Sequence, residues 1–318
     1  MRTFLAALLL AFPAFAHAAE FTIATFNTEF LTRSKVHVKF GFPFELEKRA
    51  DIATWAAPGF RDQKFAEATA AVAEVVAGIN ADVIVLVEVG NDADVAELNA
   101  VVAAKGVIYP HVEVCACTDT ATQQHVAVLS KFQLDGVLRA IPGREGYFQE
   151  LDDADSEADT GISKGILISF NFAGHVFRLY GLHLASERGG NEQDQQRIAQ
   201  ASIVRRHSLP AINAGELVIV AGDLNDGRGE PALRRIRGFD DMWPDLIQTG
   251  SHQYFDDADE GSRWTYEFRG ERNQIDHVLI STSFKEIVRG GGIRPRVPNQ
   301  ANWLASDHRP FVLTLDLH

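Results

Sequence analysis

Short apolar runs of strand length recur along this chain, and several of them stop at a polar residue capable of chemistry. Residues 83–87 are apolar and end at Glu88, and residues 217–221 lead into Gly222-Asp223. Four to eight apolar residues bounded by polar or turn residues are typical of buried β-strands. Because the strands of a sheet end at common edges, we expect these polar residues to gather around one cleft.

Hydrophobic periodicity predicts helices between some of the strands. Apolar residues recur at spacings of three and four over residues 61–80, and residues 192–208 are also predicted to be helical. The predicted strands cover residues 21–26, 83–87, 126–129, 165–172, 176–182, 217–221, 274–280 and 311–317, with a hairpin turn at Ala173-Gly174. We therefore expect an α/β fold of two sheets flanked by helices.

The first 18 residues have the composition of a secretory signal peptide. Arg2 precedes an apolar stretch, and Ala16-His17-Ala18 fits a small-x-small cleavage site. We expect cleavage near Ala18 and export to the periplasm or the medium. Residues 19–318 contain no linker or repeat and are expected to form one domain, without a further apolar run of the ~18 residues that stable membrane insertion needs.

The chain is acidic, with a formal net charge of −13. This charge argues against a protein held to nucleic acid by many Lys and Arg contacts. It leaves a nuclease open, because bound cations or a local basic groove can reverse the field at the site. No protein partner can be inferred from the sequence.

Two further sequence features point away from additional cofactors. Cys115 and Cys117 are the only cysteines, which excludes a cysteine-rich zinc site and favours a local disulfide or two free thiols over a redox or metal role. The acidic runs 152–159 and 256–260 lack the ligand spacing of a calcium loop. They are predicted to be solvated loops, with structural Ca²⁺ as the alternative.

The polar residues at the strand ends form a set suited to metal-assisted hydrolysis of phosphate esters. A carboxylate can hold a hard cation, and a nearby imidazole can hydrogen-bond a phosphoryl oxygen or move a proton. Each residue alone has an ordinary structural explanation, such as a turn or a helix cap. The chemistry is indicated by the whole set, which comprises Asn27, Glu88, His183 and Asp223 after strands and Asp307-His308 before the last strand.

The same positions carry a resemblance to a known superfamily. Six short motifs follow its order: Thr25-Phe26-Asn27, Val87-Glu88, His183-Leu184, Gly222-Asp223-Leu224-Asn225, Ile275-Asp276-His277 and Ser306-Asp307-His308. The chain resembles the endonuclease/exonuclease/phosphatase superfamily, which includes deoxyribonucleases, abasic-site endonucleases, sphingomyelinases and inositol-polyphosphate phosphatases. The resemblance implies a four-layered α/β sandwich with two mixed sheets face to face and the site at one end.

The resemblance also implies a metal site. Glu88 would be the principal metal ligand, with Asn27 and Asp307 close by. The expected cation is Mg²⁺, with Mn²⁺ as the alternative, because Mg²⁺ accepts few protein carboxylates and retains several waters.

Five residues are implied to act on the phosphate. His308, oriented by Asp276, would hydrogen-bond the scissile phosphate. Asp223 and Asn225 would position the attacking water and the phosphoryl oxygens. His183 would bind the phosphate or protonate the leaving group.

The segments around the site bear on the substrate. Residues 264–270 resemble an aromatic segment of secreted bacterial nucleases, and Arg269 and Arg309 would suit phosphate binding beside stacked bases; a core-facing strand is the alternative for these rings. His125 and Lys164 are weaker substrate-binding candidates, with an ordinary surface location as the alternative. We therefore expect a metal-dependent endonuclease acting on DNA or RNA.

Three other functions stay open. A sphingomyelinase-like lipid phosphodiesterase would insert the apolar segment 40–44 into a membrane, although this segment is equally suited to internal packing. A phosphatase acting on a small molecule would use the same catalytic set. A non-catalytic binding protein on the same fold would have lost catalytic positions, and none is lost.

Overall fold

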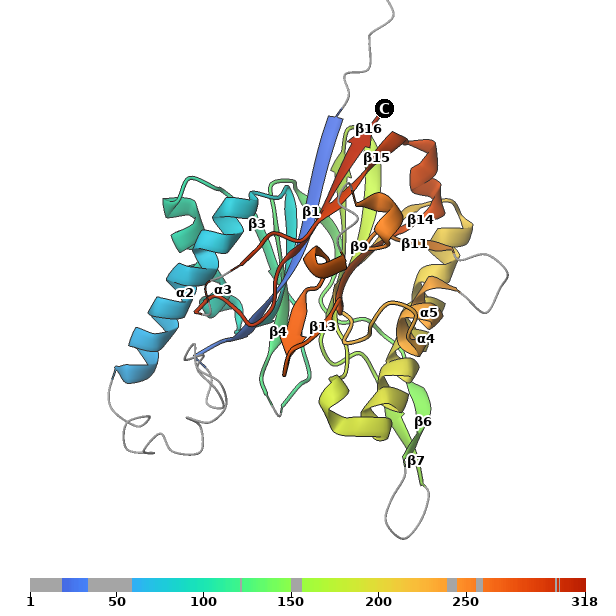
Figure 1. Cartoon of the computed structure of the whole chain (residues 1–318), viewed down its shortest axis with the longest axis horizontal. Coiled ribbons are helices and arrows are strands. Elements are labelled where there is room, and N and C mark those ends of the chain that lie inside the picture. The colour runs from blue at the N-terminus through green and yellow to red at the C-terminus, as the bar shows by residue number, and fades with distance from the viewer. Residues whose placement is uncertain are drawn as a thin grey trace, which may run out of the picture.

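The computed structural model describes residues 19–33, 59–120, 122–149, 156–238, 245–255, 260–300, 302 and 304–318. The predicted signal peptide and the apolar segment 40–44 lie outside the described residues. Two six-stranded sheets face each other, and helices cover the outer face of each sheet (Figure 1). This arrangement confirms the predicted α/β sandwich.

The first sheet has the strand order β15-β16-β1-β2-β4-β3. Strands β1 and β2 are parallel, and the other neighbours are antiparallel. The strands are β1 (Ala19–Leu31), β2 (Val83–Val89), β3 (His111–Val114), β4 (His125–Ser130), β15 (Val288–Arg296) and β16 (Phe311–Leu317).

The second sheet has the strand order β11-β14-β10-β9-β8-β5. Its only parallel pair among the described strands is β9 with β10. The hairpin predicted at Ala173-Gly174 is confirmed as the β8–β9 turn. The strands are β5 (Leu134–Leu138), β8 (Gly165–Phe172), β9 (His175–His183), β10 (Leu217–Asp223), β11 (Leu246–Gln248) and β14 (Asp276–Ser281).

Four α-helices among the described residues complete the layers. Helices α2 (Phe60–Ile79) and α3 (Asp92–Ala104) pack on the first sheet, whereas α4 (Gly190–Asn213) and α5 (Pro231–Arg237) pack on the second. A third apolar cluster, which includes five phenylalanines, fills the space between the sheets. Helix α3 was not predicted, although Asn91 caps it by accepting hydrogen bonds from the backbone N–H groups of Ala93 and Asp94.

The strand pairing places the predicted site residues at one end of the sandwich. Asp223 at the end of β10 pairs with His183 at the end of parallel β9 and with Asp276 at the start of antiparallel β14. In the first sheet, Thr25 is the last residue of β1 in register with β16, and it pairs with Phe311 at the start of β16. The carboxyl ends of the parallel strands and the amino ends of β14 and β16 therefore meet at the same edge.

Two small hairpins project from the sandwich: β6 (Glu145–Gln149) with β7 (Ser156–Thr160), and β12 (Tyr266–Phe268) with β13 (Glu271–Asn273). The end of the first acidic run lies on strand β7 and not in the predicted loop, but the Asp159 side chain is solvated there, since it is exposed and pairs with Arg144 on the surface. Most of the run 256–260 lies outside the described residues, and Glu260 begins a short 3₁₀ helix.

The two cysteines form a local disulfide, with their Cα atoms 5.2 Å apart. This agrees with the first of the two local alternatives. Within the described part of the chain, no helix is both long and apolar enough to cross a membrane.

Gly222 lies where the backbone of a neighbouring strand leaves no room for a side chain. Its φ angle is +149°, and a Cβ atom built there would lie 1.9 Å from the carbonyl oxygen of Leu182 on the neighbouring strand. We expect Gly222→Ala to lower the free energy of unfolding by about 3 kcal/mol or more, since it combines overpacking with backbone strain. Urea unfolding of the purified protein measures this loss.

Gly78→Ala is the matched control. Gly78 lies in helix α2, and a Cβ atom there has no neighbour within 4 Å. This substitution should leave stability unchanged or raise it by up to ~1 kcal/mol. Equal stability of the two variants would contradict the close approach between β9 and β10.

Candidate active site

The centre of the site is a hydrogen-bonded group that links the two sheets. The side-chain amide of Asn27, on β1, donates to Glu88 Oε1 at 3.2 Å and to Asp223 Oδ2 at 2.9 Å. His183 Nε2 lies 3.7 Å from Glu88 Oε1 and 4.0 Å from Asp223 Oδ2. Glu88 belongs to the first sheet and Asp223 to the second, so Asn27 holds carboxylates from both sheets together.

The backbone around this group adopts unusual conformations. Glu29, Phe30, Glu88 and Asn225 all have φ between +46° and +60°, in the left-handed region that side chains other than glycine rarely occupy. Such residues cost of order 1–3 kcal/mol each and cluster at functional sites. The Glu88 backbone is left-handed, and the Glu88 side chain accepts a hydrogen bond from the Phe30 N–H at Oε2, at 3.1 Å.

A second group is built around His308. Its Nδ1 lies 2.8 Å from Asp276 Oδ2, and Asp276 is fully buried. Asp223, Asp276 and His308 place ligand-type atoms within 4.8 Å of one another. Asp223 therefore belongs to both groups and joins them into one site.

The loop before β16 fixes the position of His308. Ser306 donates its hydroxyl to the carbonyl of Asn27 at 2.7 Å and accepts the His308 N–H at 2.9 Å. Gln300 Nε2 donates to the carbonyls of Ser306 and His308. Sequence reasoning missed both positioning roles, although Ser306 stands within one of the recognised motifs.

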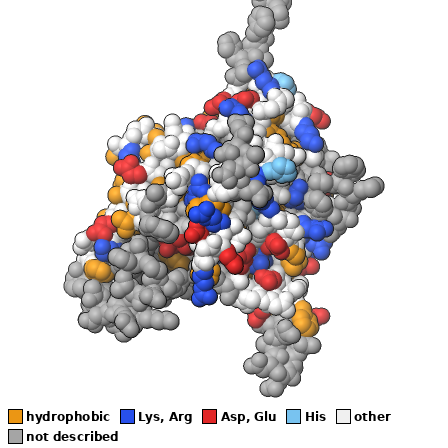
Figure 2. Space-filling view, in the orientation of Figure 1, with side chains coloured by type: hydrophobic (Ala, Val, Ile, Leu, Met, Phe, Trp, Pro, Cys, Tyr) orange, Lys and Arg blue, Asp and Glu red, His pale blue; other side chains and the backbone are white. Residues whose placement is uncertain are grey.

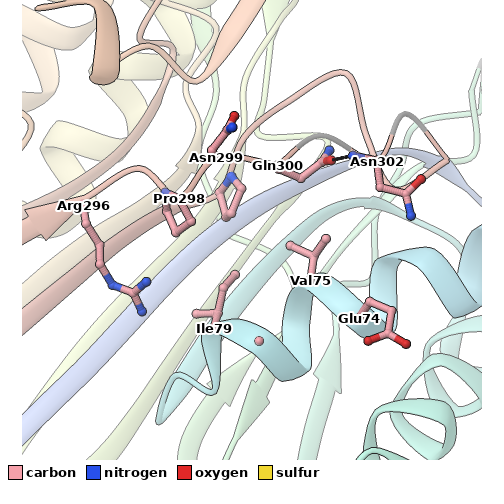
Figure 3. A pocket seen from close by; sticks show the side chains of 10 residues that line it. Glu74, Val75, Ile79, Arg296, Pro298, Asn299, Gln300 and Asn302 are labelled. Atoms are coloured by element: carbon pink, nitrogen blue, oxygen red, sulfur yellow. Dashed lines mark hydrogen bonds between the residues drawn. The ribbon is translucent and has the colours of Figure 1, made fainter.

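The same loop borders a hollow of about 340 Å³ against helix α2 (Figure 3). In this view Val75 and Ile79 on the helix lie below the loop residues Pro298 and Gln300. None of the predicted site residues lines the hollow. The candidate site thus lies outside this hollow, although the same loop borders both.

Asn225 and Asp307 complete the set. The Asn225 N–H donates to Asp223 Oδ1 at 2.9 Å, and its side-chain amide donates to the Leu184 carbonyl. Asp307 Oδ1 lies 4.0 Å from His308 Nε2, and the Asp307 N–H donates to Glu29 Oε2 at 3.1 Å. Glu29 was not predicted as a site residue, yet its carboxylate stands beside Asp307.

Burial and neighbouring charges shift the ionisation of four groups. Burial alone would lower the pKa of His308, but Asp276, Asp307 and Asp223 raise it to about 10. Burial lowers the pKa of His183 well below its ordinary value, and the positive charges of Lys164 and His308 lower it further. Burial, together with Asp276, raises the pKa of Asp223 to about 7, and burial also raises the pKa of Glu88.

Comparison with known proteins agrees with this geometry. A model of the Endonuclease/Exonuclease/phosphatase family matches residues 24–308. The chain belongs to this family. Members of the family are phosphoric ester hydrolases and typically use a divalent metal.

Several solved structures share the fold. TDP2 from Caenorhabditis elegans is 16% identical with a TM-score of 0.56, over 94% of this chain and 74% of that chain. A family protein from Leptotrichia buccalis is 13% identical with a TM-score of 0.54, over 93% and 99%. One from Beutenbergia cavernae is 16% identical with a TM-score of 0.56, over 94% and 72%. No curated protein matches the chain.

The donor set fits the divalent cation that the family uses. Glu88, His183 and Asp223 offer ligand atoms within 4.8 Å of one another, and the oxygen ligands suit Mg²⁺ or Mn²⁺. The buried atoms His183 Nδ1 and Asp276 Oδ1 have no hydrogen-bond partner in the structure. Of the three predicted ligands, Asn27 is hydrogen-bonded to Glu88, and the charge of Asp307 acts on Glu88. When bound, a divalent cation supplies positive charge to phosphoryl oxygens.

The four residues predicted to bind substrate have different surroundings. The Lys164 side chain is mostly buried and donates a hydrogen bond to Gln124 Oε1 at 3.3 Å. Its positive charge acts on both Glu88 and His183, so Lys164 faces the site. His125 begins β4, and its Nδ1 lies 3.1 Å from the Gln123 carbonyl. Arg269 is exposed at the turn of the β12–β13 hairpin.

Arg309 differs from its prediction as a substrate-binding residue. Its guanidinium is buried and donates to the carbonyls of Pro298, Ser262, Trp264 and Val297. These bonds tie the loop before β16 to the segment before β12. The side chain therefore braces the loops, because its donors point into the protein while the adjacent His308 points to the site.

Loss of the Glu88 charge should abolish metal-dependent stabilisation. At an Mg²⁺ concentration about 100 times Kd, a single site raises the free energy of unfolding by about 2.7 kcal/mol. We expect this rise in the wild type and almost none in Glu88→Gln, measured by calorimetry with Mg²⁺ and with EDTA.

Glu216→Gln is the control. Glu216 adjoins the start of β10, at the end opposite Asp223, and pairs with Arg178. It should keep the full response to Mg²⁺. An undiminished response in Glu88→Gln would show that the cation binds elsewhere.

Proposed function

We propose that this protein is an exported, divalent-metal-dependent phosphodiesterase that cleaves DNA or RNA internally by in-line attack of water. One observation carries the proposal: the His308–Asp276 pair lies within 4.8 Å of the Asp223 carboxylate, which shares Asn27 with Glu88. Cationic, water-orienting and metal-binding groups thus meet at one point.

His308 provides the fixed positive charge. Its Nδ1 is occupied by Asp276, so Nε2 is the atom that donates to a phosphoryl oxygen. With its pKa raised to about 10, the imidazole is cationic at neutral pH. A preorganised cation at this position stabilises the charge that develops on the phosphoryl oxygens.

Asp223 is the residue placed to orient the attacking water. Its two oxygens accept hydrogen bonds from the Asn27 amide and the Asn225 N–H, which fix the plane of the carboxylate. Its pKa of about 7 suits a group that takes a proton from water near neutral pH. Asn225 acts mainly by holding this carboxylate in place.

The surroundings of His183 favour one of its two predicted roles. Its lowered pKa keeps the imidazole neutral at neutral pH. A neutral imidazole is a poor acid but still carries one N–H donor. We therefore assign His183 to binding a phosphate oxygen rather than to protonating the leaving group.

Charge alone does not select among the substrates of this family. On the face that Figure 2 shows, Lys and Arg side chains lie interspersed with Asp and Glu. Nucleic acid is favoured over lipid and small esters by the rings and the exposed Arg269 on the hairpin beside His308. The non-catalytic alternative is disfavoured because every predicted catalytic position is present at the site.

Nicking of supercoiled plasmid tests the proposed function. The wild type is expected to nick with Mg²⁺ and to stop with EDTA. His183→Ala should lower the rate by about 10²–10³-fold, the usual effect of removing one phosphate-stabilising donor. Agarose gels resolve the nicked product.

His175→Ala is the matched control, because His175 starts the strand that His183 ends. It should nick at the wild-type rate. Absence of nicking by the wild type, with hydrolysis of a sphingomyelin or of a small phosphate monoester instead, would replace the nuclease with one of the two alternatives.

The His308–Asp276 pair should behave as one unit. We expect Asp276→Asn to lower kcat/KM by about 10²-fold or more, since the imidazole loses its negative partner. Adding Asp276→Asn to His308→Ala should then lower kcat/KM little further, because each substitution alone already removes the positive charge of the His308 imidazole. Plasmid-nicking rates of the two single variants and the double variant measure the coupling; losses that multiply would contradict it.

A further inference from the structure

A row of rings leads outward from His308 along strand β12. The Tyr266 ring stacks on the imidazole, with centroids 4.6 Å apart and planes at 28°. The Phe268 ring continues the row, 6.4 Å from Tyr266 and parallel to it within 7°. The Arg269 guanidinium lies 5.1 Å from the Phe268 centroid and ends the row with a positive charge.

The strand period explains this row. Tyr266 and Phe268 are two residues apart and therefore point to the same face of β12. An antiparallel backbone bridge pairs Tyr266 with His308, which places the Tyr266 ring next to the imidazole. The turn after Phe268 is made by Arg269 and Gly270, both with positive φ.

The base of the hairpin is fixed to the catalytic residues. The Thr265 hydroxyl oxygen accepts hydrogen bonds from the N–H groups of Ile275 and Asp276, both at 3.1 Å. The Thr265 carbonyl accepts the Arg309 N–H at 2.7 Å. Because Asp276 is the partner of His308 and Arg309 follows His308 in the chain, the rings hold a defined position relative to the His308–Asp276 pair.

The outer ring, Phe268, is far more exposed than the phenylalanines between the sheets. Phe268 is 47% exposed, whereas Phe170 and Phe177 between the sheets are almost fully buried. A single exposed ring is common on protein surfaces. What sets Phe268 apart is its alignment with a second ring and with the imidazole of the proposed catalytic pair.

We propose that Tyr266 and Phe268 form a stacking platform for an unpaired nucleobase next to the phosphate that His308 contacts, with Arg269 contacting a neighbouring phosphate. This inference rests on the proposed nuclease function and specifies its substrate class. Flat rings stack on any base, which contributes about 1–3 kcal/mol per base. Bases inside a duplex have their faces covered, so the platform selects single-stranded or frayed nucleic acid.

The test compares Phe268→Ala with the wild type on a single-stranded, radiolabelled oligonucleotide. We expect kcat/KM to fall by roughly 5- to 150-fold, the range that corresponds to the loss of one stacked base. Phe268→Trp should restore activity, because indole also offers a flat face. Phe148→Ala is the matched control, since Phe148 is also 47% exposed but lies on the β6–β7 hairpin.

A second substrate separates stacking from a general effect on the site. An oligonucleotide of abasic residues keeps the phosphates but has no bases to stack. On this substrate Phe268→Ala should match the wild type within about twofold. Removing the ring and removing the bases abolish the same stacking contact, so the substitution has nothing further to remove.

The outcomes distinguish the two proposals. Nuclease activity that is equal in Phe268→Ala and Phe148→Ala would overturn the platform and leave the nuclease standing. An equal loss on the abasic and the normal strand would overturn it too. A wild type that cleaves no nucleic acid would refute the nuclease, and the platform with it.

Discussion

The polar bonds between the two sheets are the constraint on which the site depends. Along most of their length the sheets are held together by apolar side chains, but at one end Asn27 bonds Asp223 and His308 bonds Asp276 across the gap. Buried carboxylates are costly unless they are paired or hydrogen-bonded. Asp223 and Asp276 each accept support from a residue on the side of the other sheet, so closing the sandwich assembles this part of the site.

The same end of the molecule holds much of its backbone strain. Glu29, Phe30, Glu88 and Asn225 have positive φ, and Gly222 adopts a conformation that leaves no room for a Cβ atom. The apolar strands β1, β2 and β10 hold these conformations in place, since their buried residues fix the strand ends. Stability supplied by the core thus maintains a geometry that the local sequence would not favour.

Eight of the twelve strands in the two large sheets, and the polar residues at their ends, were predictable because their signals are local; the strands β3, β5, β11 and β15 were not predicted. An apolar run such as that ending at Glu88 identifies both a strand and the polar residue that follows it. The ring row was not predictable, because the contact between Tyr266 and His308 joins segments far apart in the sequence. Arg309 was misjudged for a related reason: it follows His308 directly, but its side chain turns inward to backbone carbonyls that the sequence does not reveal.

The charges at the site indicate an order of binding. Glu88, Asp223, Asp276 and Asp307 converge there; the positive charges of Lys164 and His308 act on Glu88, and that of His308 acts on Asp223. A phosphate diester is itself an anion and is repelled by unpaired carboxylates at short range. The family's divalent cation would offset that repulsion, and it would also favour the ionised form of Glu88, whose pKa burial raises. We therefore infer that the cation binds before the phosphate or together with it, so that an acidic protein can accept an anionic substrate.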